Sequence, residues 1–392
     1  MGEGVEFQLS EEQKLIRETA RAFVDKEVIP HVKEWEEKGE IPRTVTKKMA
    51  KLGFFGIPIP EKYGGAGLDY VSFALVVEEI ARGCNSLRTT LSVQTSLTGT
   101  TLLAFGSEAQ KESILAPLTR GEFLGAWALT EPDAGSDAAN LRTTAKREGD
   151  EWVLNGAKRF ISNGNVAEYV VVFAREPGTS RHEGISTFLV KQGTPGFQVT
   201  NVETNTKLGL RASPTADLAF DDCRIPADHL IGEEGKGWET AMYVLNHGRL
   251  GVAAGAVGIG QACLELSIQH AQERHAFDRP IGAFQLVREM IAEMAVEVEA
   301  ARLLYLKAAW LRDQGQDNRL AVSLAKLFGA QMAVRCADRA VQIYGGYGFS
   351  GEYPVERHFR DAKILGIYEG TNEIQKMVIA HELLGELRKA QA

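Results

Sequence analysis

The spacing of apolar positions changes twice along the chain and divides it into three parts. From Ser10 to about Gly121, apolar residues recur at helical spacing after a capped start at residues 10–13. From about Phe123 to Glu234, short β-rich runs are separated by Gly, Asn and Pro, which indicates antiparallel strands. From about Trp238, long amphipathic runs return and are joined by short turns that contain Gly or Pro.

These three parts predict an α+β fold. We expect an N-terminal α-helical domain over residues 1–122, a middle antiparallel β-barrel or β-sandwich domain over 123–235, and a C-terminal four-helix bundle over 236–392. The middle part shows no βαβ alternation, so a doubly wound nucleotide-binding domain is disfavoured. The long helices of the last part are predicted at Met242–His275, Ala283–Gln314, Asn318–Tyr344 and Asn372–Leu387.

Charge and cysteine usage narrow the possible partners. The net charge of −8 argues against nucleic-acid binding, because phosphate contacts need a basic face. The four cysteines are scattered and the histidines show no metal-ligand spacing, so we expect neither disulfides nor a metal. No apolar run approaches the length of a membrane span, and the acidic start resembles neither a secretory signal nor a transit peptide. We therefore expect a cytoplasmic protein with no nucleic-acid or membrane partner.

Three familiar motifs of nucleotide-binding proteins and hydrolases are not supported. Residues 255–260 superficially match a dinucleotide-binding fingerprint, but they lie inside a helical run with no preceding strand, so close helix packing is the better interpretation. Residues 232–237 lack the Walker pattern and are expected to form the loop that enters the last domain. The absence of a G-x-S-x-G elbow weakens a serine-hydrolase interpretation.

Glu369 is harder to explain by a structural role alone. Glu369 stands beside Gly and Thr, just before the apolar run that starts at Ile374. Thr371 or Asn372 could cap the helix that follows, and Glu369 would then be a solvated loop acid. The apolar approach over residues 364–368 instead indicates a partly enclosed carboxylate. Enclosure disfavours the charged form and would raise the pKa of Glu369 towards that of a useful base.

Five motifs, taken together, resemble the acyl-CoA dehydrogenase family. They occur in the family's order, and the resemblance runs from Leu9 to the C-terminus. It implies the family's helical, β and four-helix-bundle domains, in agreement with the apolar pattern. The motifs are residues 129–137 (LTEPDAGSD), 155–163 (NGAKRFISN), 273–277 (ERHAF), 342–348 (QIYGGYG) and 368–371 (YEGT).

The resemblance implies an FAD site between the β-domain and the bundle. In the family this cofactor also touches a neighbouring subunit, so we expect an obligate homo-oligomer, a tetramer. Backbone groups near Trp127 and Leu129 and the hydroxyl of Thr130 would face the flavin ring. Gly135 and Ser136 would approach the pyrophosphate.

Further FAD contacts are implied in the β-domain, after Glu369 and on the adjacent subunit. Phe160 stands where the family often has Trp, and Glu373 stands where Gln is frequent. The residues expected against the isoalloxazine are Phe160, Ile161 and Ser162, and those after the catalytic loop are Thr371 and Glu373. The residues expected to hold the adenine half from the adjacent subunit are Arg274, Phe277, Gln285, Gln342, Gly345 and Gly346.

The same resemblance assigns Glu369 as the catalytic base. Removal of a weakly acidic thioester α-proton requires that the developing enolate charge be stabilised. In the family, the backbone N–H of the catalytic Glu and a ribityl hydroxyl of FAD hydrogen-bond the thioester carbonyl. Glu369 would take the α-proton while the β-hydride passes to flavin N5, which gives a trans-2-enoyl-CoA. An electron-transfer flavoprotein would reoxidise the flavin.

The resemblance also implies the substrate contacts. Some family members carry the base on a bundle helix instead, at the position of Gly248, so Glu369 is the only matching base. Arg249 resembles the family's CoA-facing or structural Arg, and Asn246 replaces a frequent Asp. The expected contacts to the substrate are Arg88, Ser136, Asn246, Arg249, Tyr368 and Gly370.

The substrate is left open between two classes. Most of the chain resembles the short- and branched-chain members, so a short- to medium- or branched-chain acyl-CoA is expected. Residues 87–97 are instead similar to glutaryl-CoA dehydrogenase, in which the Arg matching Arg88 holds the distal carboxylate. We favour a plainer role, in which Arg88 reaches solvent or pairs with Glu78 or Glu79, because Ala81 stands where that subfamily has an acid. A dicarboxylyl-CoA remains the alternative.

Two other classes of function use the same fold. A related flavoprotein oxidase would carry an acid other than Glu at the base position. A non-catalytic scaffold would be expected to have lost Thr130, Arg274 or Glu369. All three residues are present in this sequence, which favours the dehydrogenase.

Overall fold

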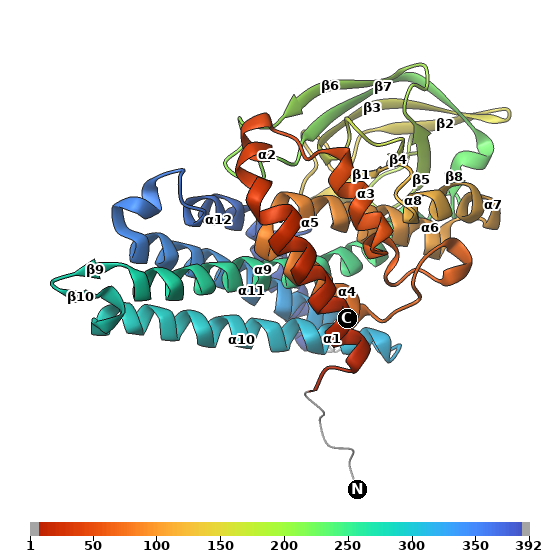
Figure 1. Cartoon of the computed structure of the whole chain (residues 1–392). Coiled ribbons are helices and arrows are strands. Elements are labelled where there is room, and N and C mark those ends of the chain that lie inside the picture. Colours follow the sequence, from red (N-terminus) through yellow and green to blue (C-terminus); the bar gives the residue numbers. More distant parts are fainter. Residues whose placement is uncertain (1–7, 386–392) are drawn as a thin grey trace, which may run out of the picture.

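Helices, strands and again helices follow one another along the chain, in the order that the apolar spacing predicts (Figure 1). The computed structural model describes residues 8–385. The β-domain sits at one end of the molecule, against the long C-terminal helices, and the N-terminal helices cover one side of both (Figure 1).

The N-terminal helices begin with the predicted capping box. The Oγ of Ser10 accepts from the N–H of Gln13 at 3.1 Å, and the Oε1 of Gln13 accepts from the N–H of Ser10 at 3.0 Å. A π-helical turn at Val93–Gly99 joins α5 to α6 in one continuous buried helix. The helices are α1 Glu11–Phe23, α2 Val32–Lys38, α3 Arg43–Lys51, α4 Tyr70–Gly83, α5 Asn85–Ser92, α6 Thr100–Phe105, α7 Glu108–Gln110 and α8 Ala116–Thr119.

The middle domain is a twisted sheet with the strand order β6-β7-β3-β2-β4-β5-β8, and β1 lies beside β4. Most neighbours are antiparallel as predicted, but β1 pairs with β4 in parallel. A parallel pair requires a crossover, which the β2–β3 hairpin and the loop before it supply. Alternate side chains such as Trp152, Leu154 and Phe188 point inward and form the core. The strands are β1 Gly125–Ala128, β2 Thr144–Glu148, β3 Glu151–Ser162, β4 Tyr169–Arg175, β5 Ile185–Lys191, β6 Phe197–Glu203, β7 Thr215–Pro226 and β8 Leu230–Ile231.

Long helices return after the sheet, as predicted. Glycines on the first of them, α9, allow neighbouring helices to approach closely. A Cβ at Gly258 would lie 2.2 Å from the carbonyl oxygen of Glu78, and one at Gly260 would lie 2.6 Å from Sδ of Met332. Residues 255–260 are therefore a packing feature. The elements are α9 Gly237–Glu273, β9 His275–Ala276, β10 Arg279–Pro280, α10 Gln285–Asp313, α11 Arg319–Tyr344, α12 Val355–Ala362 and α13 Asn372–Leu384.

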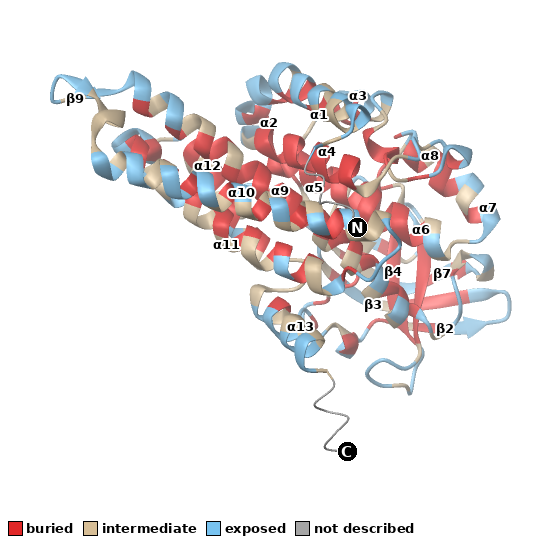
Figure 2. Cartoon of the chain, turned by 90° about the horizontal axis from the view of Figure 1, so that it is seen from below, coloured by how far each residue is buried: buried red, intermediate tan, exposed pale blue. Residues whose placement is uncertain are grey.

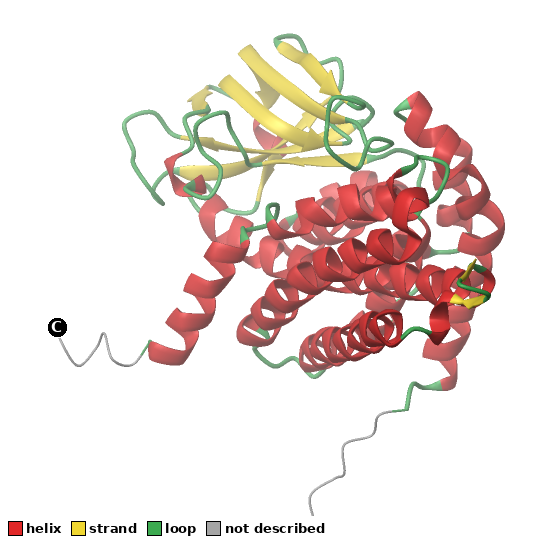
Figure 3. Ribbon diagram, turned by 90° about the vertical axis from the view of Figure 1, so that its left-hand side faces the viewer, coloured by secondary structure: helices red, strands yellow, loops and turns green. Residues whose placement is uncertain are grey.

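The last predicted helix forms, but it lies at the edge of the helical body. Helices α9, α10 and α11 pack on one another, and α4 of the N-terminal domain packs against α9 and α10. Helix α13 lies against α11, and the C-terminal helix stands apart from the others in Figure 3. Its Gln375 is buried, whereas Met377 and Leu383 are each 66% exposed. The apolar face of α13 therefore lacks a full partner within residues 8–385.

Within residues 8–385, two helices are apolar enough over 18 residues to cross a membrane by length and composition, although the sequence interpretation expected no such run. Their windows have a mean hydropathy of 1.4 in α9 and 1.3 in α11, and they are 72% and 61% buried inside the fold. Figure 2 shows this burial along α9. Such windows are typical of core helices, because a helix that is apolar on all sides must be covered.

The four cysteines are buried free thiols, as predicted. No group of three His, Cys, Asp or Glu side chains within residues 8–385 is arranged to hold a metal ion.

Candidate active site

Glu369 lies in a tight turn at the start of α13. The backbone of Glu369 has a φ of 53° and that of Gly370 a φ of 92°, so two consecutive residues are left-handed. The Oγ1 of Thr371 accepts from the N–H of Ile374 at 3.2 Å and caps α13, which confirms Thr371 as the capping residue. The turn directs Glu369 away from α13 and towards α9.

The carboxylate of Glu369 occupies the space beside Gly248 of α9. A Cβ on residue 248 would lie 2.0 Å from Oε2 of Glu369 and 2.9 Å from Cδ2 of Leu97. The two positions at which the family is expected to carry its base therefore converge on one place. Glycine at 248 is what leaves room for the acid at 369.

Both carbonyl groups of the turn are held by cations, one half-buried and one fully buried. The Nε of Arg249 donates to the carbonyl oxygen of Glu369 at 3.2 Å. The Nζ of Lys326 donates to the carbonyl oxygen of Gly370 at 2.7 Å, and Nε2 of Gln375 donates to the same oxygen at 3.2 Å. Arg249 thus makes a structural contact, and its contact with CoA stays a prediction.

The surroundings of the Glu369 carboxyl group raise its pKa to about 7. Burial is the main cause, and the nearby charges of Arg88, Arg249 and Lys326 oppose it. Oε2 is buried and has no hydrogen-bond partner within the described residues. A carboxyl group with a pKa close to neutral and an unengaged oxygen is suited to take up a proton. The interpretation of Glu369 as a solvated loop acid is therefore wrong.

Arg88 is also enclosed, contrary to the role we favoured for it. It is 1% exposed; its Nε donates to Oδ1 of Asn85 at 2.9 Å, and Nη2 donates to the hydroxyl of Tyr368. The carboxylates proposed as its partners are engaged elsewhere: Glu78 pairs with Arg302 at 2.9 Å, and Glu79 with Arg82 at 2.8 Å.

Arg88 therefore neither reaches solvent nor pairs with Glu78 or Glu79. No ion pair of Arg88 with any carboxylate occurs within residues 8–385. A buried cation without an anion is costly unless a ligand supplies one.

Three glycines on one face of α9 each face a polar group. Gly248 faces Glu369, and a Cβ at Gly251 would lie 3.2 Å from Oγ of Ser92. A Cβ at Gly255 would lie 2.9 Å from Nε of Arg88. Seven residues of helix, about 10 Å, separate the first glycine from the last. A row of polar groups thus runs from the carboxylate to the guanidinium.

A buried ion pair holds the loop that follows β1 in the β-domain, where residues 129–131 lie. The Nζ of Lys158 lies 2.7 Å from Oε1 of Glu131 and also donates to the carbonyl oxygen of Leu129 at 3.2 Å. Glu131 accepts in addition from the backbone N–H groups of Arg142 and Thr143. Lys158 thus holds the residues on both sides of Thr130.

The predicted isoalloxazine contacts lie on two faces of β3. Phe160 has a φ of 61° and a side chain that is 55% exposed, and Ser162 is half-buried. Ile161 is buried in the β-domain core, because successive strand residues point to opposite faces. A contact of Ile161 with the flavin would therefore be made through its backbone, and its place against the isoalloxazine stays a prediction.

Other residues that the sequence predicts to contact FAD or the substrate differ in how accessible they are. Trp127 packs against Phe173, with ring centroids 4.8 Å apart, and donates to Oγ1 of Thr101 at 3.2 Å. Asn246 donates to Oδ1 of Asn318 at 2.9 Å, so its amide already serves a helix–helix contact. Among these predicted contacts, Gly135, Ser136 and Glu373 are exposed to solvent.

The residues expected to hold an adenine group gather at the far tip of the helical body. The guanidinium of Arg274 lies 5.3 Å from the ring centre of Tyr347, so Arg274 stacks on an aromatic ring. Gly248 and Glu273 are 25 positions apart on α9, and about 38 Å of helix therefore separates this tip from Glu369. Arg274, Phe277, Gln285, Gln342, Gly345 and Gly346 belong to this group.

Comparison with known proteins identifies the family. The short-chain specific acyl-CoA dehydrogenase of Rattus norvegicus mitochondria is 43% identical over 381 residues, which cover 97% of this chain and 92% of that protein. Acyl-CoA dehydrogenase family models match here as the N-terminal domain at residues 10–122, the middle domain at 126–223 and the C-terminal domain at 235–384. The chain belongs to the acyl-CoA dehydrogenase family. It is an FAD-dependent oxidoreductase that acts on acyl-CoA.

Other relatives of this acyl-CoA dehydrogenase differ in substrate. The glutaryl-CoA dehydrogenase of Desulfococcus multivorans is 42% identical and covers 98% of this chain and 100% of its own. A glutaryl-CoA dehydrogenase from Mycobacterium smegmatis in complex with FADH2 has a TM-score of 0.91 at 36% identity, covering 96% and 95% of the two chains. A chain in the structure of the electron transferring flavoprotein of Acidaminococcus fermentans has a TM-score of 0.95 at 42% identity, covering 97% and 100%.

Residues of the β-domain of this acyl-CoA dehydrogenase are suited to bind FAD. A Cβ at Gly135 would meet no atom within 4 Å, so the backbone there is open to a phosphate. The exposed ring of Phe160 offers a surface on which a flat ring system can stack. Phe160, Ser162 and Thr130 would hold the flavin half, and the tip residues would have to come from another subunit.

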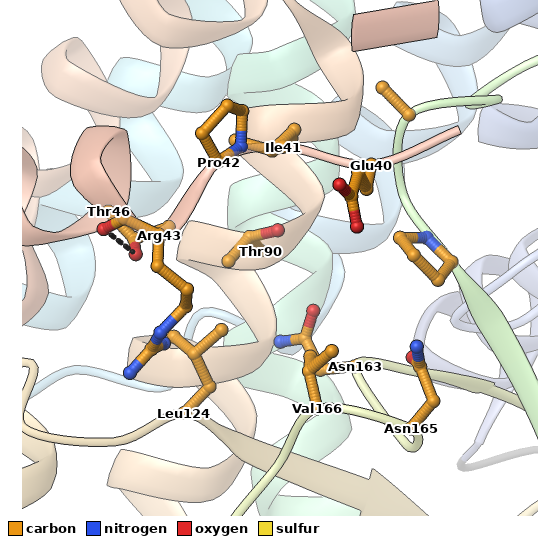
Figure 4. Close-up of a pocket in the computed structure, with 12 residues that line it drawn as sticks. Glu40, Ile41, Pro42, Arg43, Thr46, Thr90, Leu124, Asn163, Asn165 and Val166 are labelled. Atoms are coloured by element: carbon orange, nitrogen blue, oxygen red, sulfur yellow. Dashed lines mark hydrogen bonds between the residues drawn. The ribbon is translucent and has the colours of Figure 1, made fainter. Parts of the chain in front are cut away.

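A cavity of about 220 Å³ lies elsewhere in the molecule (Figure 4). It is lined by Arg43 and Thr46 of α3, Thr90 of α5 and Asn163 and Asn165 after β3. Neither Glu369 nor Arg88 lines it, so this cavity is separate from the site around the catalytic turn.

Sequence reasoning missed the residues that support the site. Lys326 stands in the apolar run Leu324 to Ala330, on the buried stripe that includes Val322 and Gly329. A lone charge on a buried helix face was the available signal. The Lys158–Glu131 pair left no comparable signal, because its members are 27 residues apart in different elements.

Proposed function

We propose that Glu369 is the base of this acyl-CoA dehydrogenase and removes the α-proton of a bound acyl-CoA. The observation that carries the proposal is the enclosed carboxyl group beside Gly248, with a pKa near 7 and one unengaged oxygen. The proton passes to the carboxylate, the β-hydrogen leaves as a hydride, and a trans-2 double bond forms between the two carbons. FAD supplies the hydride acceptor when it is bound.

The turn also offers a group that can stabilise the developing enolate. Within residues 8–385, the backbone N–H of Glu369 donates to no protein acceptor. An N–H in this position can donate to the thioester oxygen as negative charge develops on it. Arg249 and Lys326 hold the two carbonyl groups of the turn that carries this N–H and the carboxylate.

The test is spectroscopic. Purified protein should carry the yellow absorption of oxidised flavin, and anaerobic addition of an acyl-CoA should bleach it. We expect bleaching by at least one member of a panel of straight, branched and dicarboxylic acyl-CoAs. A flavin-loaded protein that no member bleaches would contradict the proposed activity.

The geometry also favours a second candidate, a dicarboxylyl-CoA such as glutaryl-CoA. The sequence alone favoured a short- to medium- or branched-chain substrate, with Arg88 in a structural role. The enclosed Arg88 lacks an ion-pair partner within residues 8–385 and contacts Tyr368, next to the base. A distal carboxylate would supply the missing anion in a charge-assisted, bidentate contact. The 42% identity to a glutaryl-CoA dehydrogenase is in keeping with this candidate.

The oligomer and the electron acceptor are also proposals. The tip residues that would hold the adenine half lie about 38 Å along α9 from the catalytic turn, so one chain cannot complete the FAD site. We infer a homo-oligomer, a tetramer, which sedimentation can check directly. The similarity to a chain in an electron transferring flavoprotein structure supports such a flavoprotein as the electron acceptor.

A further inference from the structure

Lys326 is a fully buried lysine next to the catalytic turn. It is 0% exposed in the middle of α11, where Val322, Gly329 and Ala330 are also buried. Within residues 8–385 its ammonium group forms one hydrogen bond, to the carbonyl oxygen of Gly370 at 2.7 Å, and no ion pair. A buried ammonium group satisfied by a single backbone carbonyl is uncommon, because burial of a charge is costly.

The partner of Lys326 belongs to the backbone that aims the base. The backbone of Glu369 is left-handed, with a φ of 53°. Residues other than glycine keep this strained conformation only when their surroundings hold it. Arg249 from α9 holds the carbonyl of Glu369, and Lys326 from α11 holds the next one. Two adjacent peptide planes are thereby fixed from two different helices.

We propose that Lys326 is a positioning residue whose buried ammonium group fixes the Gly370 carbonyl and so keeps Glu369 aimed at the α-carbon. This inference rests on the proposed function of Glu369 as the base. Gln375 donates to the same carbonyl at 3.2 Å, but it is neutral and lies on α13, the helix that the turn itself begins. At the Gly370 carbonyl, Lys326 is therefore the contact that connects the turn to α11, as Arg249 connects the Glu369 carbonyl to α9.

Lys326 has an electrostatic effect in addition to its geometric one. The charged groups that face Glu369 are Arg88 of α5, Arg249 of α9 and Lys326 of α11, and all three favour the carboxylate. The charges that face Lys326 are those of Glu369, Arg249 and Glu373. Loss of the ammonium group removes one of the three cations, so the pKa of the Glu369 carboxyl group should rise further.

The test compares Lys326→Met with Lys326→Arg and with a matched control, Lys207→Met. Lys207 also donates a partly buried ammonium group to a backbone carbonyl, that of Ser213, but in the β-domain. Each flavin-loaded variant is mixed anaerobically with a bleaching acyl-CoA, and the bleaching rate is followed from pH 5.5 to 9. FAD content and thermal midpoint are measured in parallel.

We expect Lys326→Met to raise the pKa of the bleaching rate by about half a unit or more. Burial lowers the pKa of Lys326 to about 8, so the rates are compared at pH 7.5, where the wild-type ammonium group is still largely charged. The rate of Lys326→Met at this pH should fall by about tenfold or more, because a slightly misplaced base reacts slowly. Lys326→Arg should recover the pKa, and Lys207→Met should change neither value. If Lys326→Met does not fold, Lys326→Gln takes its place with the same expected changes.

A variant without the ammonium group that retains the wild-type pKa and the wild-type rate at pH 7.5 would overturn the inference. So would equal changes in Lys207→Met, which would indicate general destabilisation. Failure of the underlying function is distinguishable, because wild-type protein would then not be bleached at all.

Discussion

The carboxylate of Glu369 and the Cα of Gly248 are in close contact, so that a Cβ on residue 248 would lie 2.0 Å from Oε2. Of the three glycines of α9 that face this row of polar groups, Gly248 leaves the least room for a Cβ. The identity of residue 248 therefore decides where the base can lie, although it contributes no chemical group itself.

Gly248→Ala should displace the Glu369 carboxylate and slow the bleaching of the flavin by about 100-fold, since displacement of a catalytic group by about 1 Å has effects of this size. The matched control is Gly251→Ala on the same face of α9, where the new Cβ would lie 3.2 Å from Oγ of Ser92. Stopped-flow bleaching of the two variants is the measurement. Equal rates in Gly248→Ala and wild type would show that the base does not lie where the structure puts it.

Glu369→Gln should bind FAD normally and lose substrate-dependent bleaching by about 10²–10⁴-fold, because the amide cannot accept the α-proton. The flavin spectrum gives the FAD content, and anaerobic titration gives the bleaching. Glu12→Gln, at an exposed position of α1, is the control for the loss of a carboxylate and should bleach as wild type does. Normal bleaching by Glu369→Gln would remove this residue from the mechanism.

The bleaching rate should rise with pH through an apparent pKa of about 7, because the base acts only when ionised. Burial raises the pKa of Glu369 from 4.5, so the folded state holds this proton at pH values where the unfolded chain has lost it. The same group therefore reduces the stability of the fold as pH rises from about 4.5 to 7. A bleaching rate that is flat between pH 5.5 and 8.5 would contradict this assignment.

The order of helices and strands was predictable because apolar spacing is a local property. Long runs such as those of α9 and α11 were found with ends within a few residues of those observed, except that α9 starts five residues earlier than predicted, at Gly237. The parallel pairing of β1 with β4 was not predictable, because it depends on how a distant hairpin returns the chain. The enclosure of Glu369 could be inferred from its apolar neighbours in sequence.

The surroundings of Arg88 could not be inferred in this way. Its sequence neighbours Thr89 and Thr90 give no sign of burial, and Glu78 and Glu79 stand at plausible distances along the chain. The guanidinium is buried because Gly255, on a helix far away in sequence, leaves space for it. Arg302 and Arg82 meanwhile occupy the two acids. Such competition for partners is settled only in three dimensions.

Arg88→Ala should leave the turnover of butyryl-CoA within a few-fold of wild type if a dicarboxylyl-CoA is the substrate. Turnover of glutaryl-CoA should then fall by about 100-fold or more in kcat/KM, because the distal carboxylate would be buried without its partner. Steady-state assays with the two substrates give the comparison. A similar loss for both would assign Arg88 to the support of Tyr368, which its Nη2 contacts, and would favour a monocarboxylic substrate.

Lys158→Met should destabilise the fold by about 3–5 kcal/mol, because it leaves the carboxylate of Glu131 buried without its cation. The double variant Lys158→Met/Glu131→Gln should recover part of that loss, since both charges are then absent. Denaturant unfolding of the two single variants and the double variant measures the coupling. Because the pair anchors the loop on both sides of Thr130, FAD content should fall in step with stability in Lys158→Met. A stable Lys158→Met that retains its flavin would mean that the backbone N–H groups of Arg142 and Thr143 alone are enough to hold Glu131 and the loop.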